Sequence, residues 1–205
     1  TAIASSDVSV AVPLVLGANE IKARAADANG NESGDSNILS FTLDQFAPSI
    51  DNLRIENSSG DVTGLATNDG NITLTFSVNE TQDDANIGAE LSKTILTIKK
   101  DGVPVATGPP ASAGPDYLES MNLSVDGEYT FLVTAEDSLG NRATAQVSFV
   151  LDTVPPGASI NAPAEGEVAT SNFPSISATV TGDDINPNSI TLSIDGAPVS
   201  HISML

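Results

Sequence analysis

Hydrophobic and polar residues alternate with a period of two in several short segments of the chain. The clearest is Ile72–Val78, where four apolar side chains are separated by Thr, Thr and Ser. Such alternation indicates a β-strand with one face toward a core and the other toward water. Less regular versions of the pattern predict further strands at Ile50–Ile55, Leu96–Ile98, Val103–Ala106 and Met121–Val125.

Two more strands flank a motif that occurs twice. The segment Gly17–Asn31 aligns without a gap with Gly127–Asn141, so that DANGN in the first matches DSLGN in the second. The segments that follow, Ile38–Pro48 and Gln146–Pro156, also align. In such a motif Gly supplies a positive φ, and Asp and Asn accept hydrogen bonds from nearby backbone. The motif therefore predicts a hairpin between the last two strands of a repeated unit.

A second, weaker repeat joins Asn71–Glu80 to Pro174–Asp183, and Thr94–Val105 to Asn188–Val199. Along the chain, segments from the late half of the repeated unit alternate with segments from its early half, and a late half comes first. The pattern therefore predicts a section through a tandem array. We expect a C-terminal half-repeat at 1–45, a complete repeat at 46–153 and an N-terminal half-repeat at 154–205.

The complete repeat contains seven predicted strands with frequent turn residues between them. Only Asn86–Lys93 suggests helix, and at most a turn or two. Short strands with this spacing predict an all-β fold, specifically an antiparallel β-sandwich repeated in tandem.

Three parts of the sequence resemble the bacterial immunoglobulin-like repeats of large surface adhesins and other secreted repeat proteins. They are DGEYTFLVTAED (126–137), DSLGN (137–141) and ATAQVSFVLDTVPP (143–156). Asp126–Tyr129 is similar to the tyrosine corner of that fold, in which a Tyr hydroxyl bonds backbone before the sixth strand. Asn19 stands at the matching position of the first unit, where we expect a weaker corner. The resemblance implies an immunoglobulin-like sandwich and an extracellular or cell-surface location.

The chain is strongly acidic, with 27 Asp and Glu against 7 Lys and Arg and a net charge of -20. This charge repels nucleic acid and anionic lipid, so neither is an expected partner. A hydrophobic content of 40% predicts a folded chain, and no run of 18 apolar residues predicts membrane insertion. Because the sequence begins without Met, we expect a piece of a longer protein whose targeting signals lie elsewhere.

Catalytic chemistry has little support. The chain has no Cys and a single His, His201, so no nucleophile and base pair is apparent, and we predict no enzyme activity. The paired acids Asp83–Asp84 and Asp183–Asp184 lack an aromatic sugar platform. The loop from Asp27 to Asp35 has the spacing that opens a calcium loop but lacks the later Gly and Glu. For this loop, two interpretations stay open: a plain turn and a self-contained calcium site.

The segments LDQFAPSI (43–50) and LDTVPPGASI (151–160) join one repeat to the next with little slack, and Pro stiffens them. In this topology the end of the last strand faces two loops of the following unit, the loop after its second strand and the hairpin between its last two strands. Carboxylates should then gather at each junction and favour Ca²⁺, although solvated acidic turns without metal are the alternative. The predicted ligands are Asp44, Asp83, Asp84 and Asp137 at one junction, and Asp152, Asp183 and Asp184 at the next.

These features predict a structural spacer of a bacterial extracellular adhesin or surface protein. Its partners would be neighbouring repeats of the same chain, and the half-repeats at the ends predict self-association. The alternatives are a module that binds a glycan or a host protein, and an accessory spacer of a secreted hydrolase.

The repeat boundaries predict that Phe46–Thr153 folds on its own, because it holds every strand that the sandwich needs. Limited proteolysis followed by mass spectrometry should leave a resistant fragment near those limits. Early cleavage inside Asn71–Asp152, with the two ends intact, would contradict the boundaries.

Overall fold

The computed structural model describes residues 7–80, 91–172 and 174–199. The chain divides after Asp152 into two compact units, which are described in turn. Helical structure in the described residues is limited to a single 3₁₀ turn, η1 (Pro187–Ser189). No helix in the described part of the chain is long and apolar enough to cross a membrane.

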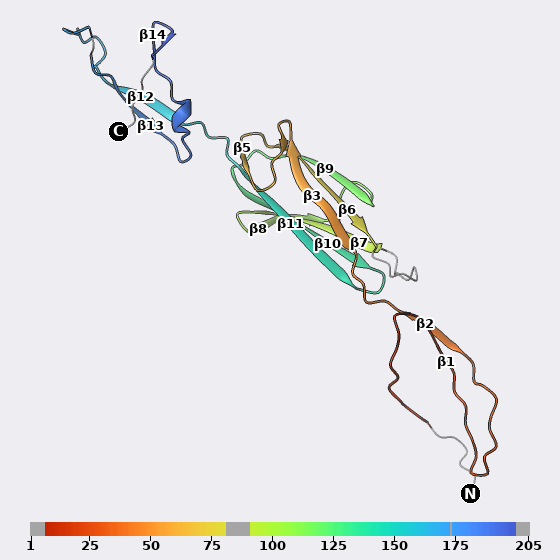
Figure 1. Ribbon diagram of the computed structural model, residues 1–205. Coiled ribbons are helices and arrows are strands. Elements are labelled where there is room, and N and C mark those ends of the chain that lie inside the picture. Colours follow the sequence, from red (N-terminus) through yellow and green to blue (C-terminus); the bar gives the residue numbers. More distant parts are fainter. Residues whose placement is uncertain (1–6, 81–90, 173, 200–205) are drawn as a thin grey trace. The chain divides into compact units, whose positions relative to one another are not determined.

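Two sheets form a sandwich in the first unit (Figure 1). One sheet has the order β5-β11-β10-β7-β8 and the other has the order β4-β3-β6-β9. All neighbouring strands are antiparallel except β5, which runs parallel to β11. The fold is therefore the all-β, antiparallel sandwich that the sequence predicts. The strand bounds are β3 Ser49–Asn57, β4 Gly60–Asp61, β5 Ala66–Thr67, β6 Asn71–Asn79, β7 Leu91–Lys100, β8 Val103–Gly108, β9 Asp116–Asn122, β10 Gly127–Asp137 and β11 Arg142–Leu151.

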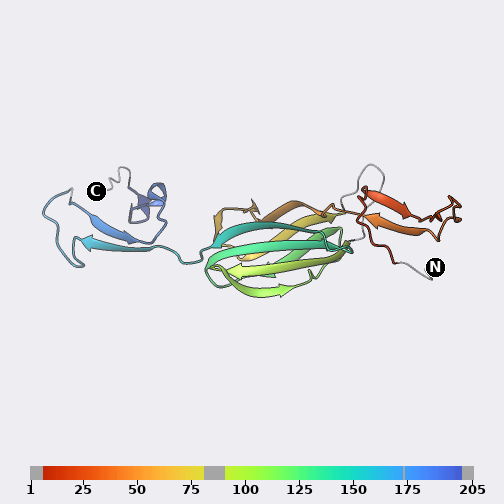
Figure 2. The same ribbon diagram turned by 90° about the horizontal axis from the view of Figure 1, so that it is seen from below.

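The core lies between these two sheets, whose strands run along a common direction in both views (Figures 1 and 2). In β6 and β10 every second side chain is buried, as the period of two requires. Phe131 stacks on Phe149 within one sheet, and Phe76 stacks on Tyr117 within the other. Complete burial of one such side chain stabilises the fold by roughly 1.5–3 kcal/mol, so this layer is the main source of stability.

The strand predictions differ from the structure at two places. The strand expected at Met121–Val125 is β9, which begins at Asp116 and ends at Asn122. The Leu123 N–H still donates to the Gly70 carbonyl, one residue beyond the last β6–β9 pair, and Ser124 and Val125 lie outside the strand. The stretch Asn86–Lys93 lies mostly outside the described residues, and its last three residues open β7 instead of forming helix.

A two-stranded sheet precedes the sandwich in the first unit. It pairs β1 (Gly17–Ile21) with β2 (Leu39–Leu43) and places Asn19 opposite Phe41. The register equals that of β10 and β11, where Tyr129 lies opposite Phe149.

The predicted corner is present in both places. The Tyr129 hydroxyl donates to the Val125 carbonyl at 2.8 Å. At the equivalent position, the Asn19 side chain donates to the Val15 carbonyl at 2.7 Å and accepts from the Val15 N–H at 3.0 Å. Asn19 thus closes its corner with two exposed hydrogen bonds to Val15, whereas the Tyr129 corner has one part-buried bond and a buried ring, and the expected weakening at Asn19 stays a prediction.

The second unit contains four short strands and the turn η1. Its first pair is β12 (Gly157–Ala162) with β13 (Ser177–Thr181), and its second pair is β14 (Ser193–Ile194) with β15 (Ala197–Pro198). Among residues 153–172 and 174–199, no hydrophobic side chain is buried. The strands therefore form sheets that lack a covering layer among the described residues.

Replacement of Tyr129 by Phe should lower the free energy of unfolding by about 1 kcal/mol, because one hydrogen bond is lost while the buried ring remains. Equilibrium urea unfolding followed by far-UV circular dichroism measures the change. Val125→Ala is the control, since it keeps the accepting carbonyl and trims an exposed side chain. Equal stability of wild type and Tyr129→Phe would show that the corner contributes nothing.

Candidate metal site

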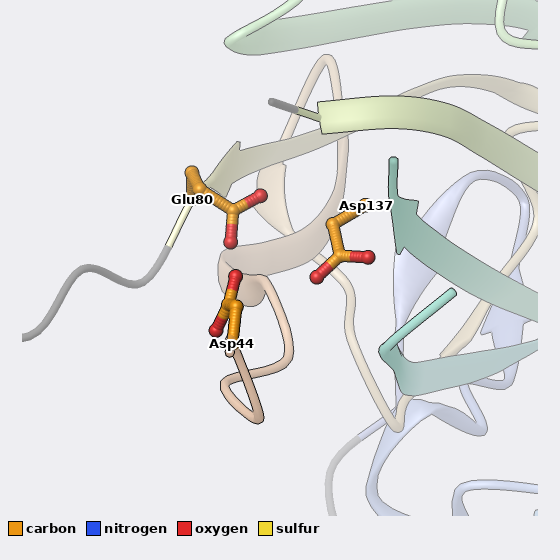
Figure 3. Close-up of side chains that lie close together, drawn as sticks. All are labelled: Asp44, Glu80 and Asp137. Carbon is orange, nitrogen blue, oxygen red and sulfur yellow. The ribbon is translucent and has the colours of Figure 1, made fainter. Parts of the chain in front are cut away.

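Three carboxylates from separate segments of the first unit converge at one end of the sandwich (Figure 3). Asp44 follows β2, Glu80 follows β6, and Asp137 is the last residue of β10. One oxygen from each lies within 4.8 Å of the other two. Asp44 and Asp137 are buried, with exposed fractions of 8% and 1%, and both carboxylate oxygens of Glu80 are buried as well.

Asp137 is fixed by the hairpin that it begins. Its Oδ1 accepts from the N–H groups of Leu139 and Asn141 at 2.8 and 2.9 Å, and its Oδ2 accepts from the Asn141 side chain at 2.8 Å. Burial acts to raise the pKa of Asp137, but these hydrogen bonds outweigh it and hold the pKa below the usual value. The carboxylate is therefore ionised at neutral pH although it is almost completely buried.

Asp44 and Asn141 connect the linker between β2 and β3 to this hairpin. Asp44 Oδ1 accepts from the Phe46 N–H at 2.9 Å, which closes a turn at the start of the linker. The Asp44 carbonyl accepts a long hydrogen bond of 3.4 Å from the Asn141 side chain. Asn141 thus donates hydrogen bonds to two of the three residues of the cluster, to the Asp137 carboxylate and to the Asp44 backbone carbonyl.

The charges at this position repel one another. Two carboxylates about 5 Å apart at an effective dielectric of about 20 interact by roughly 3 kcal/mol, and the cluster contains three such pairs. A divalent cation reverses the sign of this interaction. Oxygens that share one Ca²⁺ lie at most about 5 Å apart, which is twice the usual bond length. The cluster has the ligand type and spacing to hold a metal ion.

The structure brings together two of the residues predicted for this junction, Asp44 and Asp137. Asp83 and Asp84 lie outside the described residues. Glu80 was missed by the sequence analysis, although it is the first residue of the loop that was expected to contribute. The signal was available: a carboxylate directly after an alternating strand lies at the end of a sheet.

The second predicted junction remains a prediction, because Asp152 ends the first unit while Asp183 and Asp184 belong to the second. Asp152 donates its N–H to the Thr67 carbonyl at 3.0 Å. Asp183 and Asp184 lie exposed after β13.

The hairpin at Asp27 repeats the hydrogen bonds of the hairpin at Asp137. Asp27 Oδ1 accepts from the N–H groups of Asn29 and Asn31, both at 2.9 Å. Further along this loop, Asp35 forms ion pairs with Lys22 and Arg24. The carboxylates of Asp27 and Asp35 are thus already engaged, the first by backbone N–H groups and the second by cationic side chains. This favours a plain turn over a self-contained calcium loop.

Comparison with known proteins adds a limited likeness. No family model matches this chain. Three proteins of Lactococcus lactis subsp. cremoris, a PII-type, a PIII-type and a PI-type proteinase, are each 25% identical to it over 193 residues. The aligned region covers 94% of this chain and 9–10% of each proteinase. The chain therefore spans about a tenth of the length of these relatives.

Replacement of Glu80 by Gln should raise the melting temperature in chelator, because it removes two of the three repulsive pairs. Each 1 kcal/mol of relief corresponds to about 2–4 °C for a chain of this size. The control is Glu128→Gln, the same change at an exposed position near the other end of β10. A lower melting temperature for Glu80→Gln in chelator would contradict net repulsion within the cluster.

Proposed function

We propose that this chain is a structural spacer segment of a bacterial extracellular or cell-surface protein, stiffened by Ca²⁺ at the junction between successive β-sandwich repeats. The observation that carries the proposal is the position of Asp44. It lies in the linker between β2 and β3, whereas Glu80 follows β6 and Asp137 ends β10, both within the sandwich. One cation bound to all three would fix the linker to the sandwich.

The local geometry supports a rigid junction. The Asp44 turn and its contact with Asn141 already restrict the linker, and Pro48 fixes φ just before β3. Calcium takes six to eight oxygen ligands, mostly carboxylates and carbonyls, and the three acids supply several of them. In a spacer of this kind, calcium binding converts a repulsive junction into a stiff one.

The likeness to segments of three lactococcal proteinases favours one form of the proposal, an accessory spacer beside the catalytic part of a secreted hydrolase. The relatives are named for their proteinase activity, and this chain matches only about a tenth of each. We assign no catalysis to this segment, since its single His and lack of Cys leave no nucleophile and base pair. Its role would be to hold other domains at a distance from the cell surface.

Addition of Ca²⁺ should raise the melting temperature of the wild type and lengthen or stiffen the particle in small-angle X-ray scattering, relative to protein in chelator. Asp44→Asn removes one ligand charge at the first junction and should weaken Ca²⁺ binding in titration calorimetry by on the order of tenfold or more. Asp152→Asn makes the same change at the second predicted junction. Mg²⁺ serves as the ion control, because it prefers smaller octahedral sites.

Unchanged melting and scattering on calcium removal would contradict the calcium proposal. If only Asp44→Asn reduces the response, the ion binds at the first junction alone. If only Asp152→Asn does so, the cluster around Asp137 is a set of acidic turns without a structural metal.

A further inference from the structure

The outer face of the β4-β3-β6-β9 sheet carries a polar hollow that the candidate metal site does not use. It is lined by residues of β3, β6 and β9, with β6 in the centre, and its volume is about 300 Å³. This volume is at the lower end of the range for small-molecule sites, which suits a ligand of one ring. The side chains that line the hollow on this face are Asn52, Arg54, Thr75, Ser77, Asp116 and Leu118.

The hollow exists because short side chains of β6 lie between longer ones of its neighbours. Thr75 and Ser77 face outward, since Phe76 between them is buried in the core. Arg54 of β3 and Leu118 of β9 are the residues opposite Thr75 on the two sides. The short side chains therefore form the floor of the hollow, and the longer ones form its walls.

An irregularity in β3 adds an amide to the rim of the hollow. The pairing with β6 shifts register between Asp51 and Arg54, and Asn52 in this stretch has a φ of 55°, in the left-handed region. Bulges and residues with such a φ redirect side chains and are common beside binding sites. Here the Asn52 side chain reaches β6, where its Nδ2 donates to Ser77 Oγ at 3.3 Å.

The Thr75 hydroxyl indicates that a polar partner belongs in the hollow. Its Oγ1 is buried and has no hydrogen-bond partner among the described residues. Most buried polar atoms of folded proteins are hydrogen-bonded, so an exception requires an explanation. Because Thr75 lines the hollow, a ligand hydroxyl that enters between Arg54 and Leu118 would supply the missing hydrogen bond.

The charges at the hollow favour a neutral ligand. Its charged lining residues are one cation, Arg54, and one anion, Asp116, so their formal charges cancel. Arg54 is already paired through Nε with Glu56 at 2.8 Å, and the net charge of -20 on the chain repels anions. Arg54 in turn opposes the entry of a cation. A neutral molecule with several hydroxyl groups matches the donors and acceptors that line the hollow.

We propose that this hollow binds one neutral sugar ring of a glycan, a function beyond that of a spacer and independent of Ca²⁺. Asp116 would accept hydrogen bonds from ring hydroxyls, and Arg54 and Asn52 would donate to them. The Thr75 hydroxyl would bond one more, and Leu118, which is 59% exposed, would contact C–H groups of the ring. No exposed aromatic ring lines the hollow, so the expected dissociation constant lies in the millimolar range.

Titration of the full chain with glucose, galactose and mannose, followed by amide chemical shifts in two-dimensional NMR, tests the class of ligand. At least one sugar should cause saturable shifts centred on β3, β6 and β9, both in Ca²⁺ and in chelator. The matching uronic acid and amino sugar, which place a negative or a positive charge on the same ring, should bind more weakly. A charged form that binds as tightly as its neutral parent would overturn the proposal. So would the absence of saturable shifts with all three sugars at up to about 0.1 M.

Thr75→Val separates sugar binding from stability, because it removes the hydroxyl and keeps the shape of the side chain. The melting temperature should stay the same or rise, while the dissociation constant for the sugar should rise roughly three- to tenfold, the effect of one hydrogen bond. The matched control is Thr73→Val, on the same strand and face, whose Oγ1 lies 3.3 Å from Ser120 Oγ outside the hollow. It should leave sugar binding unchanged. Equal sugar binding by Thr75→Val and wild type, or equal weakening by both variants, would overturn the proposal.

Discussion

An alternating strand is stable only when a second layer covers its apolar face, and this constraint decides which parts of the chain form a core. Between β3 and β11 the chain supplies both layers, so that Phe131, Phe149 and Leu74 are removed from water. The outer strands have the same alternation and the same hairpin registers, yet their apolar side chains stay largely exposed. Identical local signals thus lead to different burial, because burial depends on the partner layer and not on the strand.

The hairpin motif that encodes the fold also provides chemistry. Asp137 caps its own turn through two backbone N–H groups, and those same hydrogen bonds keep its carboxylate ionised in a buried position. The residue that closes the turn, Asp137, therefore also presents an ionised carboxylate held in a fixed position. At Asp27 the same geometry is exposed and no other acid converges on it among the described residues, so the environment of the hairpin decides whether it forms part of a cluster.

The sequence predicted the sandwich well, because alternation and turn residues are local signals. It placed β9 several residues too late because Leu123 and Val125 continue the apolar alternation, whereas the pairing of Asp116–Asn122 with β6 depends on a strand about 45 residues earlier in the chain. It anticipated that Asp44 would approach Asp137, since the order of the repeats implied that contact. It overlooked Glu80 in favour of the more conspicuous Asp83–Asp84 pair, although the alternation that ends at Val78 already places Glu80 at the end of a sheet. It did not foresee that the Asn19 amide, which both donates and accepts, would bond Val15 at the position where Tyr129 bonds Val125.

The parallel pairing of β5 with β11 has a mechanical meaning. The chain enters the sandwich at β3 and leaves it at β11. Three backbone hydrogen bonds join residues 64–67 to the last strand and the residue after it. The Gly64 N–H donates to the Ser148 carbonyl, the Val150 N–H to the Leu65 carbonyl, and the Asp152 N–H to the Thr67 carbonyl. A pull on the two ends drives parallel neighbours past each other along their length. The three bonds are then loaded together in shear, instead of opening one at a time as in a peeled hairpin. The few residues around β5, which contribute little to the core, therefore tie the last strand to the segment between β4 and β6, and tension that reaches this segment would load the three bonds together.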